Sequence, residues 1–136
     1  MNAKLVQSEV SLLRPKLPVC VPPTTPMSEI IQTFQSKKPG CILVTNGGQL
    51  TGIITERDIV TKFVHGKKNV KTMVRELMTP NPEYLFEDDS IAFALNRMSV
   101  VGSRNIAILD KHGIPTGVIT IEDILKYIAS ELAIGK

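Results

Sequence analysis

The sequence predicts an α/β (α+β) fold built from two copies of one unit. Residues 48–59 recur 65 positions later as residues 113–124, and seven of the twelve aligned positions are identical without a gap. A duplication with such a period is typical of a repeated structural unit. In each copy, segments with helical spacing of apolar residues alternate with short apolar runs, which predicts sheets covered by helices. Each copy spans only about sixty residues, so we expect the two to pack against each other.

The first copy predicts a helix, a β-hairpin and a second helix. The expected bounds are 28–37 for the first helix, 41–44 and 52–54 for the hairpin strands, and Thr55 through Phe63 for the second helix. Pro39-Gly40 ends the first helix, and Asn46-Gly47 favours a tight hairpin turn. Thr55 stands directly before the second helix, where an N-cap residue is expected.

The second copy repeats this order. The expected bounds are 90–98 for the first helix, 106–109 and 117–119 for the strands, 111–113 for their turn, and Thr120 through Ile128 for the final helix. A short segment before each copy, here called its lead-in, is also repeated, since Leu12–Pro15 parallels Leu77–Pro80. The resulting division is an N-terminal arm (1–9), a first repeat (10–66), a linker (67–73) and a second repeat (74–132).

The composition predicts a folded, soluble, cytoplasmic protein. With 43% hydrophobic and 21% charged residues, the 136-residue chain can bury a core. No apolar run approaches the roughly twenty residues of a membrane span, and the N-terminus has no signal-peptide pattern. Cys20 and Cys41 lie in expected strands without a metal or redox spacing, so we expect buried free thiols.

The charge indicates a weak preference for anionic partners. The net charge is +3 and the isoelectric point is about 9.0, as in many proteins that bind anions. Lys and Arg are scattered, however, and an aromatic content of 4% without Trp argues against a surface that stacks on single-stranded bases. We therefore expect neither nucleic-acid nor membrane binding.

The most informative motif is Thr-x-x-Asp, which occurs as Thr55/Asp58 and as Thr120/Asp123. One interpretation is structural, because a Thr N-cap with an acid three residues later resembles a capping box, although Glu is the usual acid. The other is ligand binding. Free N–H groups at a helix start suit a phosphate, an Asp accepts hydrogen bonds from ribose hydroxyls, and the preceding motif glycine would let the backbone approach the ligand. Two copies in the same context favour a ligand.

Two arginines are further candidates for phosphate contacts. Arg57 lies inside the first motif, and Arg104 precedes the second hairpin. The counterpart of Arg57 is Glu122, so the two sites would not be equivalent. A solvent-exposed position is the alternative interpretation of Arg104.

No catalytic or metal-binding set is evident. His65 in the linker and His112 in a turn fit surface positions, and the acids at 87–89 fit the start of a helix. The sequence has neither a Walker A loop nor a Gly-x-Gly-x-x-Gly motif. We therefore expect no enzyme activity and no bound metal.

From about Val10 to Leu132, the chain resembles a tandem pair of cystathionine-β-synthase (CBS) domains, also called a Bateman module. The resemblance is carried by two Gly-x-x-Thr-x-x-Asp motifs, at 52–58 and 117–123, and by the lead-in Leu77–Pro80. It implies two β-α-β-β-α repeats packed with pseudo-twofold symmetry, and a homodimer that forms a disc of four repeats. It also implies clefts for adenosyl ligands, namely AMP, ADP, ATP or S-adenosylmethionine.

The resemblance also implies roles by matched position. These are phosphate or ribose contacts for Thr55 and Thr120, ribose hydroxyl contacts for Asp58 and Asp123, an adenine pocket lined by Ile42 and Ala107, and a lead-in position for Thr79. The chain departs from the family in two places. Arg14 stands where the second lead-in has Thr79, and the two adenine-pocket positions lack the Pro that is often found there.

These observations predict a regulatory module that binds an adenosyl nucleotide and signals its occupancy to an effector protein. The main alternative is a ligand-free dimerisation module, in which Thr-x-x-Asp serves only as a helix cap. A nucleic-acid binder is the third alternative.

Overall fold

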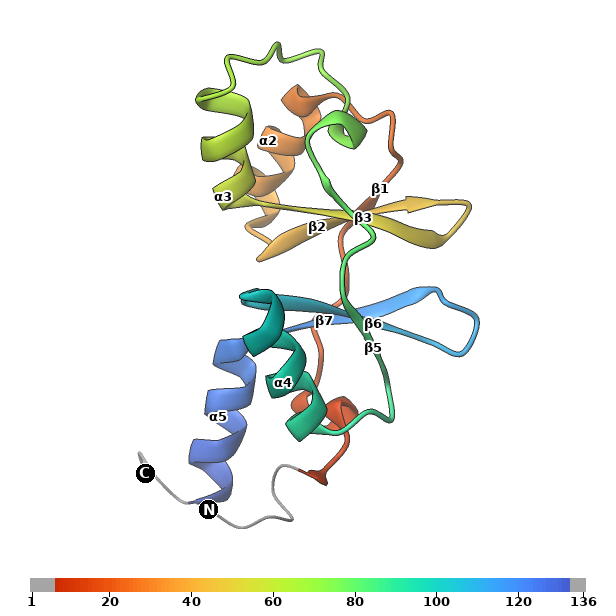
Figure 1. Cartoon of the computed structure of the whole chain (residues 1–136), viewed down its shortest axis with the longest axis vertical. Coiled ribbons are helices and arrows are strands. Elements are labelled where there is room, and N and C mark those ends of the chain that lie inside the picture. Colours follow the sequence, from red (N-terminus) through yellow and green to blue (C-terminus); the bar gives the residue numbers. More distant parts are fainter. Residues whose placement is uncertain (1–6, 133–136) are drawn as a thin grey trace. The chain divides into compact units, whose positions relative to one another are not determined.

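Both β-hairpins predicted from the sequence form in the computed structural model, which describes residues 7–132. The chain divides into two compact units. The continuous unit is residues 18–82, and the split unit combines residues 7–17 with residues 83–132. Each contains helices and one small sheet, so the predicted α/β class is confirmed (Figure 1). The predicted arm lies outside the described residues up to residue 6.

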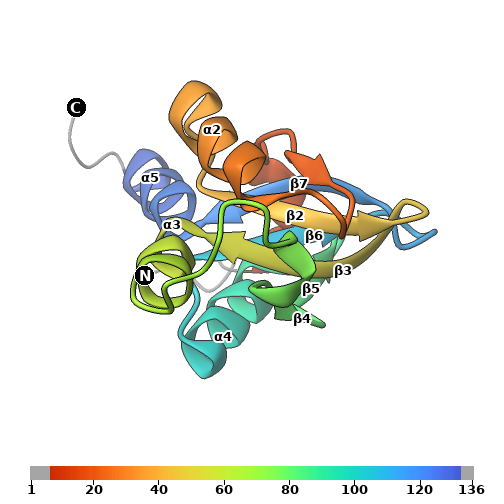
Figure 2. The ribbon, with the colours of Figure 1, turned by 90° about the horizontal axis from the view of Figure 1, so that it is seen from above.

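The continuous unit is built on a four-stranded sheet. Its elements are β1 (Cys20–Val21), α2 (Met27–Lys37), β2 (Cys41–Asn46), β3 (Gln49–Thr55), α3 (Glu56–Asp58), η2 (Ile59–Val64), η3 (Val74–Glu76) and β4 (Thr79–Pro80). The strand order is β1-β2-β3-β4, with β1 parallel to β2 and the other neighbours antiparallel. Figure 2 shows β2 and β3 side by side, with their turn directed away from α2 and α3.

The core of the continuous unit lies between this sheet and its helices. Its buried members are Met27, Ile30, Ile42, Val44, Ile54, Val74 and Leu77, with Phe34 from α2 and Phe63 from η2 packed against them. Most are aliphatic, as the low aromatic content predicts. Burial of each large side chain contributes about 1.5–3 kcal/mol, which the entropy of ordering the chain largely offsets.

The helix predicted from Thr55 through Phe63 changes type along its length. It begins as α3 and continues as η2, a π-helix in which, for example, His65 N donates to Val60 O at 3.1 Å. Three consecutive β-branched residues, Ile59–Thr61, crowd the helical turns where the change occurs. The predicted position was right, and the assumption of a regular α-helix was wrong.

The first hairpin turn is centred one residue later than Asn46-Gly47. Asn46 pairs with Gln49, so the central residues are Gly47 and Gly48, with φ values of 59° and 85°. Two positive φ values match the type I′ turn, which suits the right-handed twist of a hairpin and which glycine adopts without strain. The Asn-Gly signal therefore located the turn but not its centre.

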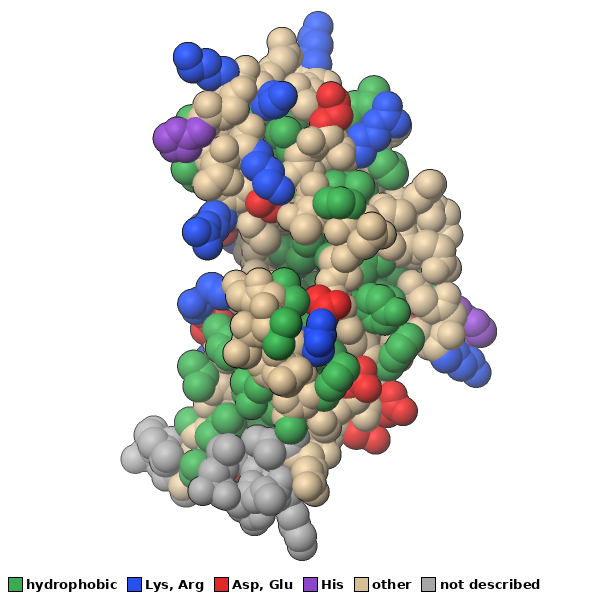
Figure 3. All heavy atoms as spheres, in the orientation of Figure 1, with side chains coloured by type: hydrophobic (Ala, Val, Ile, Leu, Met, Phe, Trp, Pro, Cys, Tyr) green, Lys and Arg blue, Asp and Glu red, His purple; other side chains and the backbone are tan. Residues whose placement is uncertain are grey.

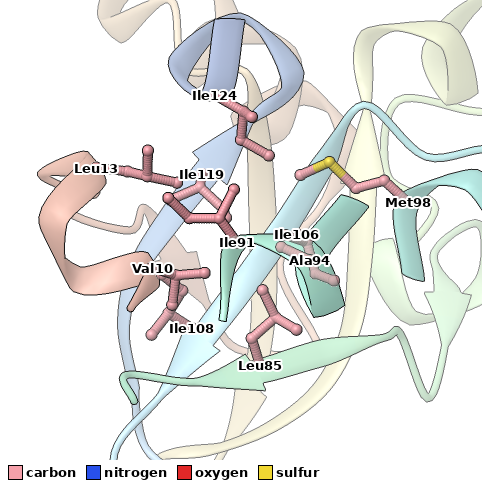
Figure 4. Packing of buried hydrophobic residues seen from close by; sticks show 10 residues of the cluster. All are labelled: Val10, Leu13, Leu85, Ile91, Ala94, Met98, Ile106, Ile108, Ile119 and Ile124. Atoms are coloured by element: carbon pink, nitrogen blue, oxygen red, sulfur yellow. The ribbon is translucent and has the colours of Figure 1, made fainter. Parts of the chain in front are cut away.

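The split unit is built on a three-stranded sheet, ordered β5-β6-β7. Its elements are η1 (Val10–Leu13), β5 (Tyr84–Phe86), α4 (Ile91–Val101), β6 (Asn105–Leu109), β7 (Pro115–Thr120) and α5 (Ile121–Glu131). Ser90 caps α4 by accepting a hydrogen bond from Phe93 N at 3.0 Å. Figure 4 shows the core, formed by Val10, Leu13, Leu85, Ile91, Ala94, Met98, Ile106, Ile108, Ile119 and Ile124.

Each lead-in belongs to the unit that contains the hairpin of the other sequence copy. Lys16, which directly follows the first lead-in, bridges Val118 of β7 through two backbone hydrogen bonds of 3.0 and 2.9 Å. Thr79, from the second lead-in, lies in β4 and pairs with Ile53 of β3. The sequence repeats and the compact units therefore differ in which lead-in they contain.

Lys16, rather than Arg14, is the structural counterpart of Thr79. Lys16 lies opposite Val118 and Thr79 lies opposite Ile53, and Val118 is the copy of Ile53. Arg14 has a left-handed backbone conformation, with φ of 53°. Two residues lie between η1 and Lys16, as between η3 and Thr79, so the gap-free alignment of Arg14 with Thr79 was wrong.

The motif glycines leave room for the lead-ins. A Cβ atom at Gly117 would lie 2.6 Å from the Cβ of Pro15, and a Cβ atom at Gly52 would overlap the side chain of Met78. Both distances are too short for real atoms. The close approach that glycine permits here is to another segment of the chain, which the sequence analysis did not anticipate.

Only one of the two cysteines is buried. Cys41 is buried and Cys20 is exposed, so the expectation of two buried thiols was wrong for Cys20. Burial, with a contribution from the nearby Cys20, raises the pKa of Cys41 to about 12. Burial also raises the pKa of Cys20.

We expect iodoacetamide to modify one cysteine of the folded protein and two of the unfolded protein, as counted by intact mass. Cys41 is shielded, and with a pKa of about 12 only about 1 in 10⁴ of its thiols would be ionised at pH 8. The Cys20→Ser variant should then take no label until it is unfolded. Rapid labelling of both thiols in the native protein would contradict this packing.

Gly117→Ala should destabilise the chain by about 1–3 kcal/mol, because the rigid ring of Pro15 cannot move aside. Gly52→Ala should cost less, since the flexible Met78 side chain can change rotamer. Urea unfolding of both variants measures the difference. The double variant Gly52→Ala/Met78→Ala is the control. Because truncation of Met78 removes the clash, the double variant should lose less unfolding free energy than the two single variants lose together. Equal, negligible losses at both glycines would show that the lead-ins do not pack there.

Candidate functional site

The two Thr-x-x-Asp motifs form complete capping boxes. In the continuous unit, Thr55 N donates to Asp58 Oδ2 at 2.9 Å, and Asp58 N donates to the Thr55 hydroxyl at 3.3 Å. In the split unit, the same bonds between Thr120 and Asp123 measure 2.9 and 3.1 Å. The structural interpretation of the motif is therefore realised in both copies, with Asp in the place where Glu is usual.

Each cap leaves one carboxylate oxygen available for another partner. Asp58 Oδ1 lies 3.4 Å from Lys62 Nζ, one helical turn further along the chain. Within residues 7–132, Asp123 Oδ1 has no hydrogen-bond partner. A carboxylate can accept at both oxygens, so Asp123 could bind a hydroxyl group without breaking its cap. Asp58 could do so by sharing or releasing Lys62.

Lys62 connects two of the predicted site residues. Its Nζ lies 3.4 Å from Asp58 Oδ1 and donates to Thr79 Oγ1 at 3.4 Å. Asp58 of the first motif and Thr79 of the second lead-in therefore lie beside one ammonium group. The sequence analysis missed Lys62, which the spacing of four residues between acid and base on one helix could have indicated.

The predicted phosphate contacts differ between the units. Arg57 is exposed and makes no ion pair with any described residue. Arg104 forms an exposed ion pair with Glu122, and this hydrogen bond from Arg104 lowers the pKa of the Glu122 carboxyl. Exposed pairs contribute little to stability, so a phosphate could replace Glu122 as the partner of Arg104.

The helix residues that follow the two Thr-x-x-Asp motifs also differ between the two units. The copy of Lys62 in the split unit is Tyr127, which packs against the core and whose hydroxyl donates to Ser8 at 3.5 Å. The continuous unit therefore has two free or exchangeable cations, Arg57 and Lys62, beside its cap. At the two matching positions the split unit has Glu122 and Tyr127, and its Arg104 is already paired with Glu122.

Ile42 and Ala107, predicted as equivalent lining residues, lie on opposite faces of their sheets. Ile42 pairs with Ile54 and is buried in the core. Ala107 pairs with Val118, the copy of Ile53, and so corresponds to Leu43. The second hairpin loop is one residue longer, with 110–114 replacing 46–49. A shift of one residue reverses the face of every side chain, so the predicted equivalence was wrong.

The other titratable residues assemble no further site. His65 and His112 are exposed, and Asp89 accepts a hydrogen bond from Phe86 N at 2.7 Å within a turn. Among residues 7–132, no three His, Cys, Asp or Glu side chains are grouped closely enough to hold a metal, and no helix is long and apolar enough to cross a membrane. Lys and Arg side chains are spread over the face shown in Figure 3 rather than gathered in one patch.

Comparison with known proteins identifies the repeats. A family model described as the CBS domain matches residues 13–65 and 74–130. The uncharacterized protein MJ1404 of Methanocaldococcus jannaschii is 34% identical over 112 residues, which are 80% of this chain and 26% of that protein. Arabinose 5-phosphate isomerase KdsD of Francisella tularensis is 26% identical over 93% of this chain and 39% of its own length. The chain thus spans less than half of these relatives.

Solved structures share the fold. An uncharacterized conserved protein from Pyrococcus horikoshii superposes with a TM-score of 0.81 at 21% identity, covering 93% of both chains. The CBS domain pair of protein MJ0100, solved with 5-methylthioadenosine and S-adenosylmethionine, has a TM-score of 0.81 at 22% identity and covers 91% of this chain and 98% of its own. Protein PAE2072 from Pyrobaculum aerophilum, solved with AMP, has a TM-score of 0.79 at 22% identity, with coverages of 90% and 98%.

The capping boxes predict the effect of removing a Thr hydroxyl. Thr120→Ala should lower the free energy of unfolding by about 1 kcal/mol, because Asp123 N loses its acceptor. Thr120→Ser keeps the hydroxyl and should stay close to the unmodified protein in the same urea titration. The cap would be unimportant if the Ala and Ser variants proved equally stable.

Proposed function

The chain belongs to the CBS domain family, and we propose that it is a regulatory module that binds an adenosyl ligand. The candidates are AMP, ADP, ATP and S-adenosylmethionine. The observation that carries the proposal is the duplicated Thr and Asp pair, in which each cap uses only one carboxylate oxygen of the Asp. Related folds solved with AMP or with S-adenosylmethionine support this class of ligand.

In this proposal, the free oxygens of Asp58 and Asp123 accept hydrogen bonds from the ribose hydroxyls. The hydroxyls of Thr55 and Thr120 and the adjacent helix N–H groups face the phosphate or its equivalent. Thr79 adds a hydroxyl in the continuous unit. Its position beside Lys62 supports this assignment.

Cationic residues would then select among the ligands. Arg57 and Lys62 favour a ligand with several phosphates in the continuous unit, because their charges are exposed or exchangeable. Arg104 would exchange Glu122 for a phosphate in the split unit. Ile42 and Ala107 were assigned to the adenine pocket. Both are buried, but Ile42 packs in the core between its sheet and helices, whereas Ala107 lies on the other face of its sheet, and Ala107 is the one that we retain.

We further propose that the chain acts as a homodimer and reports ligand occupancy to an effector protein, without catalysing a reaction itself. The ligand would shift the balance between two arrangements of the module by no more than the difference in its affinity for them. The match of this chain to only 39% of a sugar-phosphate isomerase supports the use of such a module beside other domains.

A ligand-free dimerisation module is the second candidate. The observation in its favour is that both Thr-x-x-Asp pairs form complete capping boxes. In that case the two Asp residues would stabilise helix starts and do nothing else.

Thermal unfolding with each of the four ligands tests the proposal. A ligand at about one hundred times its dissociation constant adds roughly 2.7 kcal/mol to stability, which raises the melting temperature by several degrees. The absence of any shift at millimolar concentrations of all four ligands would leave the dimerisation module as the better explanation.

Asp58→Glu and Asp123→Glu separate capping from binding. Glu is the usual partner of Thr in a capping box, so the melting temperature of the free variants should change little. The longer side chain moves the carboxylate, and the ligand-induced shift should be lost at the altered site. Retention of the full shift in the double Asp→Glu variant would exclude these carboxylates from binding.

A further inference from the structure

The helices that follow the two capping boxes each leave apolar side chains uncovered. Val60 and Val64 of η2 are 52% and 59% exposed. Leu125 of α5 and Leu132, the C-cap of that helix, are 59% and 42% exposed. The first two residues are about one helical turn apart and the last two about two turns, so each pair lies on one side of its helix. These two pairs are called the outer stripes below.

The outer stripes begin at the same position of the duplicated sequence. Val60 and Leu125 are copies of each other, since each is the fifth residue after its capping Thr. The residues directly before them, Ile59 and Ile124, pack in the cores of their units. The two helices therefore have matching inner and outer sides. Single exposed apolar residues are common on proteins, but apolar stripes at matching positions are typical of a contact surface.

The residue in front of each stripe has opposite charge in the two copies. Arg57 lies one turn before Val60, and its copy Glu122 lies one turn before Leu125. Within residues 7–132, Arg57 makes no ion pair. Glu122 is paired with Arg104, yet its side chain is still 53% exposed. Because a carboxylate accepts hydrogen bonds from more than one donor group, Glu122 can take a second cation.

The same contrast holds for the two units as wholes. Residues 18–82 contain eight Lys or Arg and four Asp or Glu, which gives a formal net charge of +4. Residues 7–17 and 83–132 together contain six Lys or Arg and nine Asp or Glu, which gives −3. Surfaces of opposite charge favour association, and surfaces of like charge oppose it. Between two copies of the chain, contact of unlike units is therefore favoured over contact of like units.

We propose that two copies of this chain associate head to tail, with the outer stripe of the continuous unit of one copy packed on the outer stripe of the split unit of the other. A twofold dimer forms this contact twice. Arg57 then lies beside Glu122 of the partner copy, and its remaining N–H donors can still face a phosphate. This inference rests on the homodimer of the proposed function and deepens it, because it gives the orientation of the two copies.

Crosslinking of cysteine variants tests the orientation. In a Cys20→Ser background, Val60→Cys and Leu125→Cys each place one accessible thiol on a stripe, since Cys41 is buried. The two variants are co-expressed, one with a tag that changes its mass, and a short bismaleimide is added. The mixture should give a covalent dimer of unequal chains, and each variant alone should give little. Covalent dimers of equal chains, or no crosslink in a sample that sediments as a dimer, would overturn the proposal and leave the homodimer intact.

Charge reversal tests the contact between Arg57 and Glu122. Sedimentation without ligand gives the dissociation constant of the dimer. Arg57→Glu should raise this constant roughly 10- to 100-fold, because two acids then face each other in both contacts. The doubly reversed variant Arg57→Glu/Glu122→Arg should recover most of the loss. Lys111→Glu makes the same change in net charge in the exposed turn between β6 and β7, and this control should not weaken the dimer.

Equal weakening in the single and double reversals, or none in Arg57→Glu, would refute the head-to-tail contact while the dimer itself stands. A chain that stays monomeric at every concentration would remove the homodimer and its orientation together. Adenosyl binding is measured separately by the thermal shifts above, so its failure is distinguishable from the failure of this inference.

Discussion

The fold depends on the contact between each lead-in and the return strand of the other sequence copy. Lys16 bridges Val118, and the adjacent Pro15 covers Gly117 so closely that no side chain fits there. The same arrangement recurs where the second lead-in meets β3. The first copy's sheet takes β4 from the second lead-in, and the second copy's sheet is bridged at its edge by Lys16, so the two halves of the sequence are tied together by topology as well as by the linker.

This contact changes the meaning of the duplicated motif. Its glycine is retained in both copies for packing, and its Thr and Asp are retained at least for capping. Duplication alone is therefore weak evidence for a ligand, because each identical position has a structural use. A ligand is suggested instead by groups that the caps leave available. These are the second carboxylate oxygen of each Asp and the cationic side chains near Asp58.

The sequence predicted the helices and hairpins because periodic apolar residues and turn residues act locally. It could not predict the exchanged lead-ins, since a bridge as short as that of Lys16 has no pattern of its own. It also misaligned Ile42 and Ala107, because both lie in continuous apolar runs, Cys41–Val44 and Ile106–Leu109, in which a shift of one position leaves no trace in composition. Lys62 escaped attention for another reason, as it lies beyond the motif and is replaced by Tyr127 in the other copy.

The differences between the copies follow a physical order. Backbone geometry, caps and core faces are kept, since an error in any of these would cost the stability of a small sheet. Side chains outside the caps and the buried cores differ between the copies. Lys62 of the continuous unit corresponds to Tyr127 on the helix of the split unit, and Cys20 corresponds to Tyr84 on the edge strand. On the helices this changes the charge beside the cap, since Lys62 pairs with Asp58 in the continuous unit, whereas Tyr127 packs against the core in the split unit. The two caps are therefore alike in their hydrogen bonds and unlike in the charge of the residues around them, which is the difference that a charged ligand would meet under the proposed function.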